Sequence, residues 1–262
     1  MFHEHGCIAA YSLAETGIQG SVKTNNNMKL VSYNNFGMNS DWTDYFFSSY
    51  ETYFDDNSHG LNPKEILPNF VKWLVQAGIL NDTKNKQITE VGKKLAESYI
   101  DMPDVVWQVI WINLTYNSPI AKWYKEAIDW GSQFTQADIE ELLKSDYPEV
   151  SPKTAHNILY ALFRTFRESP IGEMGQLISE SKQHYKKECQ TDLTNIAVAY
   201  SLYKYAEYKN IRSMRVTDIY ASDNKAGIYK EFGISKSDFV DILRSLNSET
   251  NRLIVAELNM GL

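Results

Sequence analysis

Three side chains of the metal-ligand type stand at alternate positions near the beginning of the sequence: His3, His5 and Cys7. Because successive side chains of an extended backbone point to opposite faces, this spacing would place all three on one face. Imidazole nitrogen and thiolate sulfur are ligands that Zn²⁺ accepts in proteins. The alternative is a polar chain end without a metal, since no second group of such ligands follows. We expect no bound metal and no cofactor, with these three residues as the candidate ligands if a metal is present.

The sequence lacks the short motifs of several large enzyme classes. It contains no G-x-x-x-x-G-K-[ST] phosphate loop, no G-x-G-x-x-G dinucleotide loop, no G-x-S-x-G hydrolase elbow and no H-E-x-x-H zinc site. Glu140 and Glu141 are adjacent on an expected helix, where neighbouring side chains diverge and cannot act as an acid–base pair. We therefore expect no catalytic residue in this chain.

Two groups of basic and amide side chains could contact duplex DNA. One group surrounds an expected hairpin and the helix after it, and the other lies on the outward face of an expected helix. Lysines beside a hairpin would contact phosphates, whereas an asparagine or arginine on a helix in the major groove could reach base edges. The candidate DNA-binding residues are Lys84, Lys86, Lys93, Lys94, Lys153, Asn157 and Arg164.

The elements that would position the first group follow the order of a winged-helix unit. Apolar residues recur at helical spacing from Phe70 to Ala77, so the polar residues between them should face outward. This stripe consists of Phe70, Trp73, Leu74 and Ala77, and the residues expected to point away from it are Asn69, Lys72 and Gln76. Gly78 should end the helix in a left-handed conformation. A hairpin over residues 79–89 and a helix over 90–99 complete a predicted winged helix at about residues 62–100.

Further helices are predicted from caps and apolar periodicity. Residues 105–114 are apolar on more than one face, which is typical of a helix buried on several sides. Thr135 with Asp138 has the spacing of a capping box, and Ser151 precedes a second helix that completes a pair over residues 135–166. A third unit consists of helices over residues 216–221 and 236–246, with Ser235 as a cap, and a weak strand over 253–258.

The expected fold class is mostly α, with multi-lobed winged-helix or helix-turn-helix-like units and short β-hairpins. We expect four segments along the chain. They are an irregular N-terminal segment (1–60) with one aromatic helix over residues 42–53, a winged-helix-like unit plus the buried aromatic helix (61–131), a helix-turn-helix-like pair (132–190) and a C-terminal winged-helix-like unit (191–262).

The charge of the sequence limits its partners. Its 262 residues carry a formal net charge of −7, which argues against a protein coated with nucleic acid but leaves room for a local basic patch. Residues 182–215 hold seven basic and three acidic side chains, whereas residues 1–60 hold two lysines and seven acids. A solvated helix face is the alternative explanation of the basic run.

The cysteine count and the apolar runs indicate where the protein works. Two cysteines, Cys7 and Cys189, are too few for a disulfide framework and suggest a reducing compartment. The uncharged run at residues 105–121 includes polar side chains and is shorter than a membrane span requires. We expect a cytoplasmic protein without a membrane partner.

Several runs of the sequence resemble the C-terminal region of bacterial phosphoadenosine phosphosulfate reductase-like proteins. The resemblance extends to related uncharacterised domains associated with DNA phosphorothioation and phage defence. The runs are FGMNSDWTDYFFSSYETYF (36–54), KWLVQAGILNDTKNKQITEVGKKLAE (72–97), VWQVIWINLTYNSPIAKWY (106–124), FGISKSDFVDILRSL (232–246) and LIVAELNMGL (253–262). In that family an upstream domain and a cysteine-rich iron–sulfur segment carry the chemistry. Residues 2–13 resemble the last turn of such a segment, so Cys7 alone matches a cluster ligand.

Together these observations predict a non-catalytic DNA-binding or assembly module of a sulfur-transfer, DNA-modification or phage-defence system. Its partner would be duplex DNA or a sulfur-transfer or defence protein. Two alternatives stay open. The chain could be a subunit or fragment of a phosphoadenosine phosphosulfate reductase-like enzyme whose catalytic domain is absent here. It could also be a protein–protein interaction module without DNA, which the net charge favours.

Overall fold

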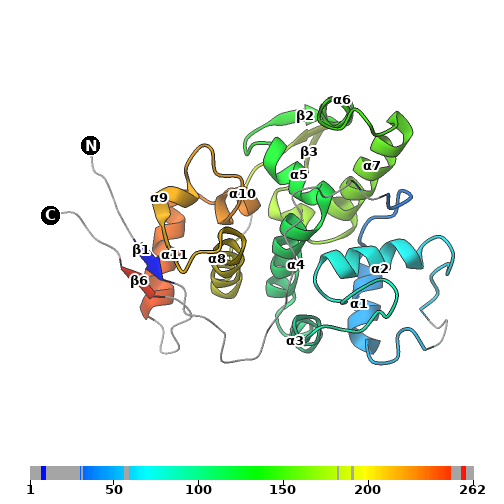
Figure 1. Cartoon of the computed structure of the whole chain (residues 1–262), viewed down its shortest axis with the longest axis horizontal. Helices are drawn as coiled ribbons and strands as arrows, with labels where there is room; N and C mark the ends of the chain where they lie inside the picture. The colour runs from blue at the N-terminus through cyan, green and yellow to red at the C-terminus, as the bar shows by residue number, and fades with distance from the viewer. Residues whose placement is uncertain are drawn as a thin grey trace. The chain divides into compact units, whose positions relative to one another are not determined.

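The computed structural model of this chain describes residues 7–9, 30, 32–55, 59–181, 183–189, 192–248 and 255–257, and it gives the backbone alone for 7–9, 248 and 255–257. The chain is mostly helical, as predicted, and forms two compact units (Figure 1). Unit 1 consists of Met1–Asn27 with Asp192–Leu262, and unit 2 of Met28–Thr191. The N-terminal segment that the sequence suggests, residues 1–60, is therefore divided between the two units.

Unit 2 is built from helices with one small antiparallel sheet. The helices are α1 (Ser40–Ser49), α2 (Leu67–Gln76), α3 (Glu90–Ser98), α4 (Pro103–Asn117), α5 (Pro119–Ala127), α6 (Gln136–Asp146), α7 (Pro152–Glu168) and the short η2 (Gly172–Met174). The strands are β2 (Gln133–Thr135), β3 (Ile178–Ser181) and β4 (His184–Lys186), in the order β2-β4-β3. This sheet and helix α5 were not anticipated from the sequence.

Helix α4 forms the centre of the core of unit 2. Every residue from Val106 to Thr115 is buried, which confirms the prediction of a helix covered on several sides. The helix packs against α2, α3 and α5. Trp111 is fully buried and meets the ring of Phe166 on α7 edge-on, with 5.6 Å between the ring centroids. Asn113 donates a hydrogen bond to the carbonyl of Ala77 at the end of α2 (2.9 Å), so a polar group is satisfied inside this core.

The predicted caps of α6 and α7 are present. The Thr135 hydroxyl accepts from the amide of Asp138, and the Asp138 carboxylate accepts from the amide of Thr135 in return, which completes a capping box. The Ser151 hydroxyl caps α7 by accepting from the amide of Thr154, and Pro152 occupies the first helical position. Local side-chain chemistry therefore fixes where both helices begin.

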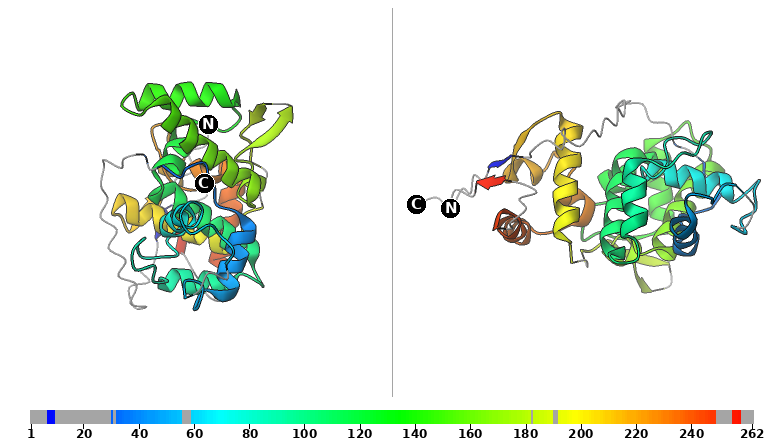
Figure 2. Two further views of the ribbon diagram at one scale, coloured as in Figure 1. Left: turned by 90° about the vertical axis from the view of Figure 1, so that its right-hand side faces the viewer. Right: turned by 90° about the horizontal axis from the view of Figure 1, so that it is seen from below.

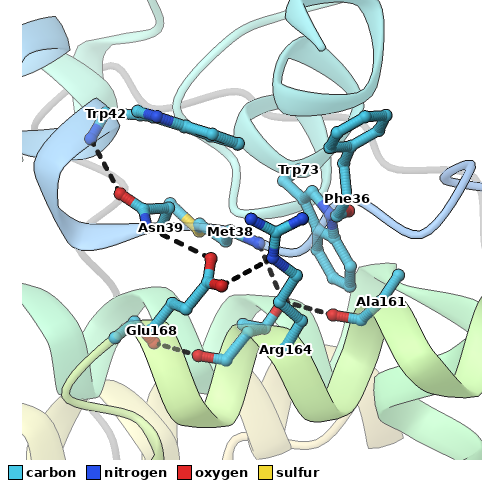
Figure 3. Close-up of polar contacts among 10 residues, drawn as sticks. Phe36, Met38, Asn39, Trp42, Trp73, Ala161, Arg164 and Glu168 are labelled. Carbon is cyan, nitrogen blue, oxygen red and sulfur yellow. Dashed lines mark hydrogen bonds and ion pairs between the residues drawn. The ribbon is translucent and has the colours of Figure 1, made fainter. Parts of the chain in front are cut away.

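Residues 32–39, here called the covering segment, form no helix or strand, turn at Asn34 and Asn35, and contact α7 through their second half (Figure 3). The amide of Met38 donates to the Thr165 hydroxyl of α7 over 2.8 Å. Gly37 approaches α7 so closely that an added Cβ would stand 2.5 Å from the Thr165 amide nitrogen and 2.7 Å from the Ala161 carbonyl oxygen. Only glycine fits here, because those neighbours are backbone atoms that cannot move aside.

The covering segment also starts the next helix. Asn39 caps α1 by accepting from the amide of Trp42 (3.3 Å), so α1 begins at Ser40, two residues before the predicted aromatic helix. That helix ends at Ser49 and continues as turns. The aromatic helix predicted in the N-terminal segment is confirmed, with shorter bounds.

Unit 1 is a small helical unit with a three-stranded antiparallel sheet. Its elements are β1 (Cys7–Ala9), α8 (Asn195–Lys209), β5 (Ser213–Arg215), α9 (Val216–Ile219), α10 (Ile228–Phe232), α11 (Lys236–Ser248) and β6 (Val255–Glu257). The strand order is β5-β1-β6, and β1 lies beside β6 in both Figure 1 and Figure 2. Helix α8 packs against α10 and α11. The predicted cap Ser235 accepts from the amide of Asp238 and starts α11.

The sequence predicts no membrane-spanning helix. Among the described residues, every helix is too short or too polar to span a bilayer.

Candidate functional site

The hairpin expected to act as a wing lies between α2 and α3. Leu80 and Ile88 form an antiparallel bridge, and Gly78 has the predicted left-handed conformation, with φ of +72°. At the tip, the Asp82 carboxylate accepts from the amides of Lys84 and Asn85, both at 2.7 Å. The hydrogen bonds from Asn85 hold the pKa of Asp82 below its ordinary value, and the charge of Lys84 contributes. The hairpin tip is thus fixed by its own acidic residue.

The four lysines of the first DNA-binding group differ in their surroundings. Lys84 and Lys94 are exposed. The ammonium of Lys86 lies 5.0 Å from the centre of the Phe54 ring, and Lys93 forms an ion pair with Glu90 at 3.3 Å. Half of this group is therefore engaged within the protein.

The outward face predicted for α2 is covered. Asn69 is buried, and its amide donates to the carbonyl of Glu65 (2.6 Å), so the prediction that Asn69 points outward was wrong. The ammonium of Lys72 donates to the carbonyl of Ser32 (2.9 Å), and burial lowers its pKa. Tyr33 donates to Gln76 over 2.6 Å.

The covering segment is the physical cause of this difference. The Tyr33 ring stacks on Trp73 with 4.2 Å between centroids, and the Trp73 indole donates to the carbonyl of Phe36 (2.9 Å; Figure 3). The apolar periodicity of α2 could not reveal that this face is covered, because the residues of the covering segment that bond to Lys72 and Trp73 lie 37 to 40 residues earlier in the sequence. A helix covered in this way does not present the face that a recognition helix uses in a DNA groove.

The second DNA-binding group lies on α7. Lys153 is exposed and Asn157 is half-buried. Arg164 is held by Glu168, with 2.6 Å between Nε and Oε1, and its guanidinium lies 5.8 Å from the centre of the Phe36 ring (Figure 3). Arg164 therefore helps to join the covering segment to α7.

The two groups belong to different parts of unit 2. In Figure 1 and in the left view of Figure 2, α7 lies toward the top of unit 2 and α3 toward its base. The helices α3 and α7, which carry residues of the first and second group, therefore lie apart within unit 2.

The basic run at residues 182–215 crosses the boundary between the two units, so its residues are described unit by unit. Lys187 is fully buried in unit 2, where its ammonium donates to the carbonyl of Ile128 (2.8 Å) and lies 4.7 Å from the centre of the Trp130 ring. Lys186 pairs with Glu188. In unit 1, Lys204 pairs with Glu207.

The metal prediction at the beginning of the chain stays a prediction. His3 and His5 lie outside the described residues, and Cys7 is described by its backbone alone. Among the side chains that the structure does describe, no three or more His, Cys, Asp or Glu residues are placed to hold a metal ion.

A surface that the sequence did not point to lies where α3 turns into α4. Ile100 is 89% exposed, and Met102, two residues on, is 40% exposed. We call residues 99–102 the Ile100 surface. Two large apolar side chains with this much exposure are unusual in so short a connection.

The turn that carries Ile100 is held in place by the residue before it. Tyr99 donates a hydrogen bond to Asp44 on α1, and its hydroxyl accepts from the indole of Trp107 on α4 (3.3 Å). Its ring lies 4.9 Å from that of Phe47. Burial, followed by the bond to Asp44, raises the pKa of the Tyr99 hydroxyl. Ile100 is therefore exposed on a fixed turn between three helices.

Acidic residues lie within four positions of Ile100 in the sequence and on α1, whose Asp44 accepts the hydrogen bond from Tyr99. All are exposed, and in the described part of the chain none of them forms an ion pair. They are Asp41, Asp44, Glu97, Asp101 and Asp104. The available signal was the pattern Ile100-Asp101-Met102, which places two apolar residues in a short connection between predicted helices.

Comparisons with known proteins found no match among protein-family models, curated proteins or solved structures. The resemblance to reductase-like proteins therefore stays a prediction.

Proposed function

We propose that this chain is a non-catalytic assembly module whose Ile100 surface binds a positively charged segment of a partner protein. The observation that carries the proposal is the 89% exposure of Ile100 on a turn fixed by the Tyr99 hydrogen bonds. An apolar side chain on a fixed turn loses little conformational freedom on binding, so its burial contributes more to affinity.

The energetic gain from the apolar residues is of a useful size. Complete burial of an isoleucine side chain is worth about 1.5–3 kcal/mol, and burial of the exposed part of Met102 would add to this. A few such anchors supply most of the affinity in many protein interfaces.

The acidic residues define the chemistry of the partner. Asp41, Asp44, Glu97, Asp101 and Asp104 would attract lysine or arginine side chains and would repel an acidic surface or a phosphate backbone. We therefore infer that the bound segment is basic and has apolar residues between its charges. By the resemblance given above, the partner would belong to a sulfur-transfer, DNA-modification or phage-defence system.

Site-specific photo-crosslinking tests the proposal. A photoreactive phenylalanine analogue replaces Ile100 in the full chain, expressed in the cells from which the gene comes. The matched control carries it at Leu142, which is 37% exposed on α6. We expect one covalent product at position 100 but not at position 142, with a basic segment at the crosslink identified by mass spectrometry. Equal amounts of crosslinked product at both positions, or no crosslinked product at position 100, would contradict the proposal.

Duplex DNA is the second candidate partner, favoured by one observation. Lys84, Lys94 and Lys153 are exposed and, among the described residues, form no ion pair. Phosphate contacts by such lysines would give affinity without sequence preference.

The DNA candidate is tested by titration of a duplex at low salt. Reversing Lys84 and Lys86 to glutamate should weaken binding to all sequences and reduce the salt slope by about one unit per lost contact. Lys225→Glu in unit 1 is the matched charge control. If the lysine reversals leave the affinity for the duplex unchanged, or if wild type does not bind a duplex at low salt, DNA is not the partner.

A further inference from the structure

Unit 1 contains a pocket of about 370 Å³ between the end of α8 and the 219–227 loop. Its volume is within the range of small-ligand sites. The side chains that matter for its chemistry are Tyr205, Lys209, Ile211, Asp218, Asp223 and Asn224.

Hydrogen bonds and close packing within the protein fix the loop that forms one side of this pocket. Asn224 is buried, and its side-chain amide donates to the carbonyls of Ile219 (2.9 Å) and Ala226 (2.7 Å). Gly227 has φ of +88°, and a Cβ added there would stand 3.2 Å from Cδ2 of Tyr205. The loop thus closes on itself and packs against the tyrosine ring.

Tyr205 supplies a hydroxyl to the pocket. The residue as a whole is 4% exposed, and its hydroxyl forms no hydrogen bond with any other described residue. The fully buried Tyr124 of unit 2, by contrast, donates to the carbonyl of Gln176. Burial raises the pKa of Tyr205, and the negative charges of Asp218 and Asp223 raise it further. A ligand could therefore satisfy this hydroxyl.

The rim of the pocket carries more negative than positive charge. Asp218 and Asp223 are exposed and, within the described residues, form no ion pair. Lys209 is the cation of the rim, and its ammonium lies 5.7 Å from the centre of the Tyr205 ring. Two carboxylates against one ammonium favour a cationic ligand.

We propose that this pocket binds a guanidinium group, carried either by an arginine side chain of another protein or by a free arginine-like molecule. The planar guanidinium offers several N–H donors, which suit two carboxylates and a tyrosine hydroxyl together. Its face also packs well on an aromatic ring, and the methylene groups behind it would lie along Ile211. This inference concerns unit 1 and does not depend on the Ile100 surface.

The test is a nuclear magnetic resonance titration of the full chain, with the ring signals of Tyr205 as the reporter. Tyr205→Phe assigns those signals. Nα-acetyl-arginine methylamide represents an arginine within a protein, and free arginine represents a small-molecule source. Nα-acetyl-citrulline methylamide has the same shape without the charge, and the corresponding lysine compound tests the need for a planar cation.

We expect saturable shifts with an arginine compound and none with citrulline. The compound that binds more tightly identifies the source. Asp218→Asn and Asp223→Asn should each weaken binding about two- to five-fold, as the loss of a partly exposed ion pair does. Asp241→Asn, an exposed acid on α11, should leave binding unchanged. Binding of the citrulline or lysine compound as tightly as the arginine one, unchanged binding in both pocket variants, or no saturable shift would overturn the inference.

Discussion

Two apolar stretches that adjoin in unit 2 have opposite surroundings. In α4 each side chain from Val106 to Thr115 is buried, whereas Ile100 and Met102, just before this helix, are exposed. The exposed turn is also well held, because Tyr99 binds both Asp44 and Trp107. The difference teaches that apolar content alone does not say whether a residue stabilises the fold. Residues of α4 are enclosed by the core, whereas Ile100 lies at the surface, where we propose that it binds a partner.

The largest effect should come from the buried side of this comparison. Trp111→Ala should lower the free energy of unfolding by about 3–5 kcal/mol, because it removes a large ring from a closed core. Chemical denaturation measures the change. Leu142→Ala, at a partly exposed position on α6, serves as the control and should change stability by less than about 0.5 kcal/mol. An unchanged midpoint for Trp111→Ala would mean that this ring is not part of the core.

A second variant tests whether the covering segment is as tightly packed as α4. Gly37→Ala should cost about 1–3 kcal/mol, since the new Cβ would stand 2.5 Å from the backbone of α7. Hydrogen exchange should also become faster in α2, because the covering segment would lift from that helix. Equal stability and equal exchange in the variant would show that residues 32–39 do not pack on α7 in this way.

A third variant addresses the caps, which are local and exposed. Thr135→Ala should cost about 1 kcal/mol, the usual value for a lost N-cap. Thr83→Ala in the hairpin loop is the control. Hydrogen bonds from Thr135 lower the pKa of Asp138, so its contribution is complete above the ordinary carboxyl pKa of about 3.9 and disappears as the pH falls through the lower folded value. If thermal unfolding cannot distinguish Thr135→Ala from Thr83→Ala, the capping box does not stabilise α6.

The smallest effect on stability is expected for the exposed turn that carries Ile100. Ile100→Ala should change the free energy of unfolding by less than about 0.5 kcal/mol, because the side chain is 89% exposed. Thermal unfolding of the purified variant checks this. A loss of several kcal/mol would show that Ile100 is buried in solution and would remove the basis for a docking surface.

The elements that sequence predicted well are those fixed by local chemistry. Helices α6, α7 and α11 begin directly after Thr135, Ser151 and Ser235, because each hydroxyl accepts a hydrogen bond from the amide three residues ahead. Helix α4 was recognisable because it is apolar all round.

The elements that sequence missed depend on distant partners. Strand β1 pairs with β5, so Cys7 lies opposite Arg215, and three-residue strands leave no periodic pattern. The covered face of α2 was missed for a similar reason, since Tyr33 and Phe36 reach it from a segment without regular structure. The Ile100 surface escaped notice because exposure is a property of the folded chain.

Calorimetric titration with the partner identified by crosslinking tests the docking surface most directly. Wild type, Ile100→Asp and the matched Leu142→Asp are each titrated with the purified partner, after thermal unfolding has shown that all three are folded. The account predicts that Ile100→Asp weakens binding by about tenfold or more, the loss expected when a central anchor is removed, while Leu142→Asp binds like wild type. It also predicts that wild-type affinity falls as salt is raised, because the acids around Ile100 attract a basic segment. Equal affinity of wild type and Ile100→Asp would contradict the account.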